Sequence, residues 1–294
     1  MFFAWFRRCA VGTILVACGC IPSAPPKEAD DKPNVDAVSA AGGAAETPAA
    51  TEARLVAEWS ALSGNRDTAR QTGRHKEIAY MLTNMRPEAL FPIIDIMGKP
   101  DTAPQVRVFA VESMSMFTQP AHIEKLGAIL DSKNDTTARA CAASLLGTIR
   151  EPKALEYLRG AANDPDRRIR FSAQLGLASQ GDKGMRDQVA AMFAQAEASP
   201  EEKTQIVLLV LKDAGPTDLP LLADALLMPT MDSVLKGMIV TSLGRIGDGS
   251  VVDSLTKSKA IVNELAYSET VDAALAVIAE RVALPTQIST QAAP

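Results

Sequence analysis

Few residues in this 294-residue sequence are of the types that usually carry chemistry. The two histidines, His75 and His122, lie far apart, and neither has a Cys, His or Glu at a spacing typical of metal ligands. We interpret both as surface histidines. No G-x-S-x-G, P-loop or G-x-G-x-x-G motif is present. We therefore expect no catalytic residue, no metal site and no dissociable cofactor.

The cysteines are crowded at one end of the chain. Cys9, Cys18 and Cys20 fall within the first twenty residues, and only Cys141 lies further along. A disulfide framework needs pairs spread through the fold, so burial alone should hold this one together. Cys141 stands beside Ala142 and is interpreted as a small packing thiol rather than a nucleophile.

Composition favours helices and argues against a nucleic-acid partner. Hydrophobic residues make up 47% of the chain but aromatic residues only 4%, so aliphatic side chains and alanine must build the core. That mixture suits closely packed helices better than sheets. The formal net charge is -5, whereas binding to phosphates requires a basic face.

The first 17 residues have the profile of a secretion signal. Arg7 and Arg8 supply a positive start, and the apolar run from Cys9 to Ala17 follows. As a helix that run would span about 14 Å at about 1.5 Å per residue, which is too short to cross a bilayer core of about 30 Å. We therefore expect residues 1–17 to be removed.

The end of this segment, Leu15-Val16-Ala17-Cys18, resembles the lipobox of bacterial lipoproteins. The resemblance implies a diacylglycerol on the Cys18 sulfur, with Cys18 left as the acylated N-terminus after cleavage. Cys20 is a weaker candidate because it lacks the leading aliphatic residue. Lipoprotein sorting rules and Gly19 then predict a lipid-anchored protein of the cell envelope, on the outer membrane if the host has two membranes.

Two segments should lack a core. Residues 18–52 carry several prolines, paired glycines and almost no large apolar side chains. Such a stretch cannot bury enough surface to offset its ordering entropy, so we expect a disordered tether with no role beyond distance. The tail, residues 285–294, is also expected to be flexible.

Between these segments a pattern recurs every 31–34 residues. A basic residue is followed three positions later by alanine, and turn residues separate amphipathic stretches. A fixed period of this length indicates a helical solenoid. We predict an all-α fold, a right-handed superhelical solenoid of about six to seven antiparallel helix pairs, over residues 53–284. The basic positions are Lys76, Arg107, Arg139, Arg170 and Lys236, with Thr204 in the register between the last two and a degenerate unit near Ala273.

The second helix of each unit has a recognisable start and a packing position. Asp135, Asp166 and Asp232 stand where N-caps belong, and Ser199 to Glu202 reads as a capping box, as does Thr102 to Gln105. The alanines that follow the basic residues should face the seam between helices, where only a methyl group fits. These alanines are Ala110, Ala142 and Ala173.

The repeated residues resemble HEAT repeats, closest to the short type first described in phycobilisome lyases. The resemblance is carried by Val106-Arg107 with Ala110, Ala138-Arg139 with Ala142, Ile169-Arg170 with Ala173, and Ser242 to Asp248. Later units depart from it at Thr204, Val207 and Ile239. The resemblance implies the solenoid fold and a concave binding surface, but no reaction, because one fold serves many functions.

Three features keep two interpretations each. The basic column either forms an internal ladder with turn aspartates, which we favour, or docks an acidic partner. The apolar run from Gln205 to Leu211 is either buried on both sides, which we favour, or an exposed stripe. Phe109 and Phe171, near Val108 and Leu175, either form an apolar contact patch for a partner or pack between units, and packing is favoured.

The leading functional hypothesis is a non-enzymatic envelope lipoprotein whose repeat surface binds a protein or peptide partner or serves as a scaffold. The membrane is contacted through the lipid anchor. The alternative is an enzyme or a lyase-like accessory subunit at the membrane surface. A third is a purely structural spacer in the envelope.

Overall fold

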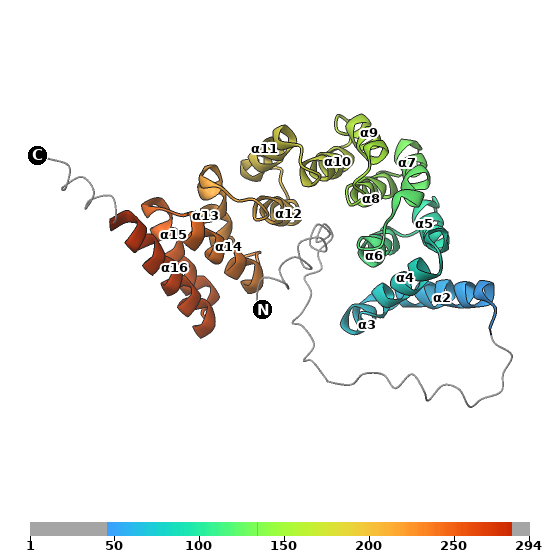
Figure 1. Cartoon of the computed structure of the whole chain (residues 1–294), viewed down its shortest axis with the longest axis horizontal. Coiled ribbons are helices and arrows are strands. Elements are labelled where there is room, and N and C mark those ends of the chain that lie inside the picture. The colour runs from blue at the N-terminus through green and yellow to red at the C-terminus, as the bar shows by residue number, and fades with distance from the viewer. Residues whose placement is uncertain (1–45, 134, 284–294) are drawn as a thin grey trace, which may run out of the picture. The chain divides into compact units, whose positions relative to one another are not determined.

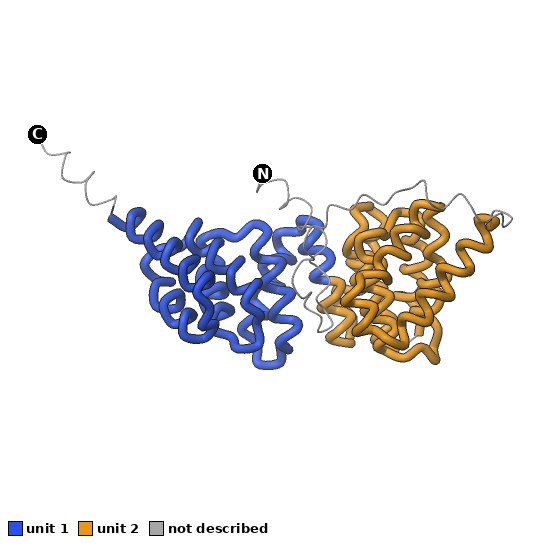
Figure 2. The backbone as a smooth tube through the Cα atoms, turned by 90° about the horizontal axis from the view of Figure 1, so that it is seen from below, with its two compact units in different colours: residues 1–19, 174–294 blue, residues 20–173 orange. Residues whose placement is uncertain are grey.

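The computed structural model describes residues 46–133 and 135–283, and within these ranges all regular structure is helical (Figure 1). The described residues divide into two compact units, here called the N-terminal unit (residues 46–173) and the C-terminal unit (residues 174–283), with the boundary inside α10 (Figure 2). The predicted all-α solenoid of helix pairs is confirmed. Cys18 and the predicted tail lie outside the described residues.

The N-terminal unit contains α2 (Pro48–Ser63), α3 (Arg66–Thr72), α4 (Arg74–Met85), α5 (Phe91–Gly98), α6 (Pro104–Met114), α7 (Ile123–Asp131), α8 (Thr136–Leu146), α9 (Pro152–Ala161) and the start of α10 (Arg167–Ser179), with short 3₁₀ turns at Pro87–Leu90 and Pro120–His122. Helices α4, α6 and α8 pack side by side in one layer, and α5, α7 and α9 form the other (Figure 1).

The C-terminal unit contains the end of α10, then α11 (Lys183–Ala191), α12 (Pro200–Val210), α13 (Leu219–Leu227), α14 (Ser233–Ile246), α15 (Val252–Val262) and α16 (Leu265–Ala283), with 3₁₀ turns at Met192–Ala194, Pro216–Asp218 and Gly249–Val251. Helix α12 packs on α11 and α13, while α14 packs on α13 and α16. Each unit therefore buries apolar helix faces in two layers.

The first helix starts earlier than predicted. Thr47 caps α2 by accepting a hydrogen bond from the Ala50 N–H at 3.2 Å, and Pro48 occupies the first helical turn. Residues 48–52 were assigned to the tether because they lack large apolar side chains. They are helical because the helix is anchored further along, where Leu55 and Trp59 are fully buried.

Most predicted helix starts are confirmed. Asp135 and Asp232 each accept from the backbone N–H three residues later, at 3.0 and 2.8 Å. Asp166 accepts from the Arg168 N–H at 2.8 Å. Ser199 and Glu202 bond reciprocally, at 2.9 and 3.2 Å. These caps are readable in the sequence because their geometry is local.

The cap predicted at Thr102 is wrong. Helix α6 begins after Ala103, which makes no side-chain cap. The Thr102 hydroxyl donates instead to the Ile96 carbonyl of α5 at 2.6 Å. It therefore satisfies the end of the preceding helix rather than the start of the next.

The repeat register also needs one correction. In α6, α8, α10 and α14 the basic residue stands four positions after the N-cap, and in α12 that position is Lys203, one residue before Thr204. The Lys203 amine lies 5.4 Å from the centre of the Phe193 ring, a cation–π distance. The basic column therefore continues through α12.

The seam alanines are placed as expected, since Ala110, Ala142 and Ala173 have no exposed surface. A similar closeness occurs at Gly127 of α7, where an added Cβ would lie 2.2 Å from the ring of Tyr157 on α9. Small residues thus let neighbouring helices approach closely in the N-terminal unit.

Ala142→Leu should destabilise the N-terminal unit by about 1–3 kcal/mol, because the larger side chain has no space at the seam. Urea unfolding followed by circular dichroism measures the effect. The matched control is Ala128→Leu on the exposed face of α7 in the same unit, which should leave stability nearly unchanged. Equal unfolding midpoints for the two variants would contradict this packing.

Candidate interaction surface

Both predicted surface histidines are buried, so that prediction is wrong. His75 lies against the ring of Phe109, with ring centres 5.0 Å apart, and its Nδ1 is 2.9 Å from the Ala69 carbonyl oxygen. The His122 Nδ1 accepts from the Gln119 N–H, and its Nε2 lies 2.8 Å from the Pro87 carbonyl oxygen. Each imidazole completes a turn between helices, a structural task that does not need the charged form.

Lowering the pH should reduce the stability of the fold because His75 and His122 are buried in their neutral form. Burial lowers the pKa of both imidazoles below the ordinary value, so below about pH 6.5 the unfolded chain binds protons that the folded chain does not. Stability present above that pH is therefore lost as the pH falls. We expect a lower urea midpoint at about pH 5 than at about pH 7.5. His122→Gln should make the two midpoints more alike, and an unchanged pH dependence in that variant would exclude His122 as a cause.

Phe109 and Phe171 are only 0% and 4% exposed, which contradicts the contact-patch hypothesis. Phe109 lies between Trp59 of α2 and His75 of α4, with centroid distances of 5.5 and 5.0 Å. The Trp59 Nε1 donates to the Ser113 hydroxyl at 2.9 Å. The packing interpretation holds, because large apolar rings are stabilised by burial.

The arginines of the basic column form an internal ladder. Arg107, only 1% exposed, donates from Nε to the Met97 carbonyl at 3.0 Å and from Nη2 to the carbonyls of Lys99 and Pro100 at 2.7 and 3.0 Å. Its Nη1 pairs with Asp135, the N-cap of α8. One side chain therefore joins the α5–α6 turn to the start of α8.

The other members of the column differ from one another. Arg139 donates to the Leu130 carbonyl at 2.8 Å and pairs with Asp164 at 2.6 Å. Arg170 donates to the Asp164 carbonyl at 2.5 Å. Lys76 is exposed. Burial lowers the pKa of the Lys236 amine, for which the described residues provide no hydrogen bond or ion pair. The ladder interpretation is thus correct for the arginines, whereas Lys236, among the described residues, interacts only with the charge of Asp232, the N-cap of its own helix, and Lys76 is exposed.

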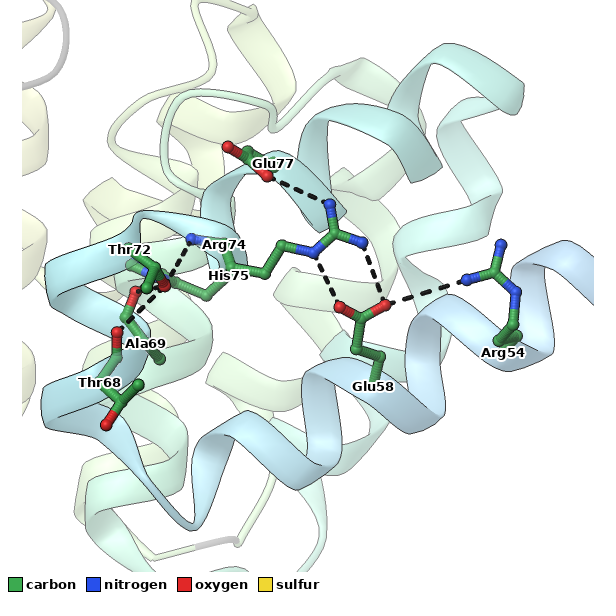
Figure 3. Close-up of polar contacts among 8 residues, drawn as sticks. All are labelled: Arg54, Glu58, Thr68, Ala69, Thr72, Arg74, His75 and Glu77. Atoms are coloured by element: carbon green, nitrogen blue, oxygen red, sulfur yellow. Dashed lines mark hydrogen bonds and ion pairs between the residues drawn. The ribbon is translucent and has the colours of Figure 1, made fainter. Parts of the chain in front are cut away.

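Ion pairs fasten α2 along α4, as Figure 3 shows. The Arg74 guanidinium donates to both oxygens of Glu58 at 2.7 and 3.1 Å and to Glu77 at 3.1 Å. These hydrogen bonds, with Arg54 at 3.9 Å, hold the pKa of Glu58 below its usual range. The cluster joins the first helices of the N-terminal unit, and each of its charged groups has a partner within the protein.

The described ranges contain no group of three or more His, Cys, Asp or Glu side chains that could hold a metal ion. Cys141 is buried, in agreement with its interpretation as a packing residue. The run from Gln205 to Val210 is buried, as favoured from its composition, and Leu211 is half-buried. No helix among the described residues has both the length and the apolar character needed to cross a bilayer.

An exposed apolar patch lies on the N-terminal unit. We define it by Tyr80 and Met81 of α4 and by Met116 and Phe117, which follow α6. Tyr80 and Met116 are 56% and 51% exposed, and the rings of Tyr80 and Phe117 are 5.9 Å apart. Because α4 packs on α6, the Tyr80 ring meets the ring of Phe117, which follows α6, and Met81 and Met116 are their exposed neighbours in the sequence. Methionine and aromatic side chains adapt well to apolar partners.

One feature of the sequence indicates this patch, although the repeat period does not reveal it. Tyr80 and Met81 lie inside the run of five apolar residues from Ile78 to Leu82, which is more than one buried helix face can hold. The surplus pair is on the outside. The sequence favours Phe109 and Phe171 as contact residues instead, because aromatic side chains are scarce.

The described residues form an all-helical repeat protein. A model of HEAT repeats matches residues 123–205, which contain α7 to α11 and the first part of α12. This segment therefore matches HEAT repeats, as its recurring arginines and alanines indicated.

Among solved structures, one to which the chain shows similarity is human deoxyhypusine hydroxylase in complex with glycerol. It is 16% identical, has a TM-score of 0.36, and the match covers 79% of this chain and 98% of that chain. No curated protein matches the chain in sequence.

Proposed function

We propose that this chain is a lipid-anchored envelope protein without an enzymatic reaction of its own, whose HEAT repeats bind a protein partner. The observation that carries the binding role is the patch of Tyr80, Met81, Met116 and Phe117. An apolar patch of this kind is costly to leave in water, and its burial against a partner is favourable. The chemistry of the patch suits an apolar helix or loop of that partner.

Site-specific photo-crosslinking tests the binding role in cells. A photoreactive phenylalanine analogue placed at Tyr80 or Met116 should produce the same discrete crosslinked product. Placed at Arg150 or Glu156, which are exposed elsewhere in the N-terminal unit, it should not. Absence of a product at both patch positions, or identical products at all four, would contradict the proposal.

The anchor part of the proposal rests on the Leu15 to Cys18 sequence. Cys18→Ala should abolish incorporation of labelled palmitate, because the thiol is the acyl acceptor. Cys20→Ala is the matched control and should be labelled normally. If labelling survives Cys18→Ala and is lost in Cys20→Ala, the acceptor is Cys20; if it survives in both, the chain is not a lipoprotein.

The competing role is that of an enzyme or a lyase-like accessory subunit. The crosslinking experiment separates the two, because an accessory subunit would yield an enzyme as the crosslinked product. A structural spacer would yield no discrete product from the patch.

A further inference from the structure

A second exposed apolar surface lies on the C-terminal unit. Helix α14 exposes Val234, Met238, Thr241 and Arg245, whose successive spacings of four, three and four residues place them in one row along the helix. Val234 is 69% exposed and Met238 is 37% exposed, although both side chains would gain from burial. The row is therefore a largely apolar strip that ends in a cation.

Helix α16 exposes a second row, formed by Ala266, Ala273 and Val277 at successive spacings of seven and four residues. Val277 is 46% exposed. Helix α16 packs along α14 (Figure 1), and the approach is close, because a Cβ added at Gly244 of α14 would lie only 3.0 Å from the Ala274 Cβ of α16. Two exposed rows thus run along a pair of closely packed helices.

Hydrogen bonds between the two helices show that the rows adjoin. Arg281 donates to the carbonyls of Gly244 and Arg245 at 2.9 and 3.0 Å. Val277 stands one helical turn before Arg281 on the same side of α16, so it lies beside the last turns of α14. Gly237 lies two turns before Gly244 and also on the side of α14 that faces α16. A Cβ added at Gly237 would meet no atom within 4 Å, so the surface between the rows is open there.

We define the α14–α16 face by the six uncharged members of the two rows, which are Val234, Met238, Thr241, Ala266, Ala273 and Val277. Arg245 lies at one end of it. The Arg245 guanidinium donates to the Ala214 carbonyl at 3.3 Å, but no carboxylate of the described residues pairs with it. By contrast, Lys257 and Lys259 of α15 each pair with an aspartate at 2.6 Å. An apolar face with an uncompensated cation at its end is complementary to an apolar surface that carries a carboxylate.

Glutamates border the α14–α16 face on its other side. Glu269 and Glu280 are exposed on α16 and, by the helical period, point further away from α14 than Val277 does. A partner should therefore place its acidic side over α14 and a neutral or basic side over α16. This asymmetry also disfavours a second acidic α16 helix as the partner, since like charges would meet.

We propose that the α14–α16 face binds an amphipathic helix of a protein partner. Two apolar side chains of that helix, one turn apart, lie over Val234, Met238 and Val277, and a carboxylate one turn further along pairs with Arg245. Met238 and Arg245 are about 10 Å apart along α14, at about 1.5 Å per residue, which matches two turns of the partner helix. This inference rests on the proposed role in protein binding but concerns another surface, so it and the crosslinking at Tyr80 can fail separately.

The test uses the full chain in lipid nanodiscs and a dye-labelled helical peptide of about 17 residues with blocked ends. The peptide carries two leucines one turn apart and, one turn further, a glutamate, in a background of alanine and glutamine. Fluorescence anisotropy measures binding, and empty nanodiscs give the blank. We expect saturable binding that is weakened at least about tenfold when glutamine replaces the leucines or lysine replaces the glutamate.

An exchange of charges tests the contact with Arg245. Arg245→Glu should weaken binding of the glutamate peptide at least about tenfold and should prefer the lysine peptide. A misfolded variant would bind neither peptide, so this reversal cannot result from unfolding. Met238→Gln should weaken binding of both peptides, and thermal unfolding checks that this exposed substitution leaves the fold intact. The matched control, Lys183→Glu on the exposed surface of α11, should bind as the wild type does.

The proposal is overturned if no saturable binding occurs up to about 1 mM, or if Arg245→Glu still prefers the glutamate peptide. Sedimentation velocity tests a second copy of the chain as the occupant. Self-association of the wild type that Met238→Gln abolishes would assign the α14–α16 face to that copy and would also overturn the proposal.

Discussion

Arg107→Met should destabilise the N-terminal unit by about 3 kcal/mol or more, because each buried acceptor left without a donor costs about 1–3 kcal/mol and Arg107 serves three of them. Removal of the guanidinium leaves three carbonyls at the end of α5 without their donor and leaves Asp135 without its counter-ion. Methionine preserves most of the side-chain volume, so the loss is electrostatic rather than a cavity effect. Urea unfolding followed by circular dichroism measures it.

Arg168→Met is the control for this change. Arg168 is exposed in the first turn of α10, so its loss should alter stability by less than about 0.5 kcal/mol. Arg107→Lys should recover only part of the loss, because an ammonium group cannot reach the carbonyls and the carboxylate together. A wild-type midpoint for Arg107→Met would show that the ladder contributes no net stability.

Phe109→Ala should also cost about 3–5 kcal/mol, because it removes a fully buried ring from a well-packed site. The cavity would separate Trp59 of α2 from His75 of α4, whose rings both contact Phe109. Loss of the near-ultraviolet signal of Trp59 should accompany the loss of stability.

Tyr80→Ala gives the comparison for Phe109→Ala, since this ring is more than half exposed on the same unit. It should cost little stability but reduce crosslinking from Met116. The opposite pattern, in which Phe109→Ala is as stable as the wild type and loses partner capture, would restore the hypothesis that Phe109 contacts a partner.

The sequence was sufficient for those parts of the fold that depend on neighbours along the chain. The caps at Asp135, Ser199 and Asp232 could be predicted because each joins residues only three positions apart. The seam at Ala142 could be predicted because the same small residue stands in the neighbouring repeats, at Ala110 and Ala173. Periodicity and capping are local signals, and helical repeats consist largely of local contacts.

The candidate site was harder to predict from the sequence, because the burial of each residue depends on side chains that pack against it from distant parts of the chain. The inward position of Phe109 is decided by Trp59, a residue 50 positions earlier on a helix that began within the predicted tether. His122 accommodates burial because Pro87, 35 residues earlier in the chain, supplies a carbonyl partner for its Nε2.

The link between Arg107 and Asp135 also sets an order of events when the chain is made. A new chain appears from its N-terminus, and the aspartate follows the arginine by 28 residues. Until α8 has emerged, the helices up to α6 can collapse only with an unpaired cation at their edge. Each of these helix pairs is thus completed by the pair after it, so a chain cut between Arg107 and Asp135 should be an easy substrate for quality-control proteases.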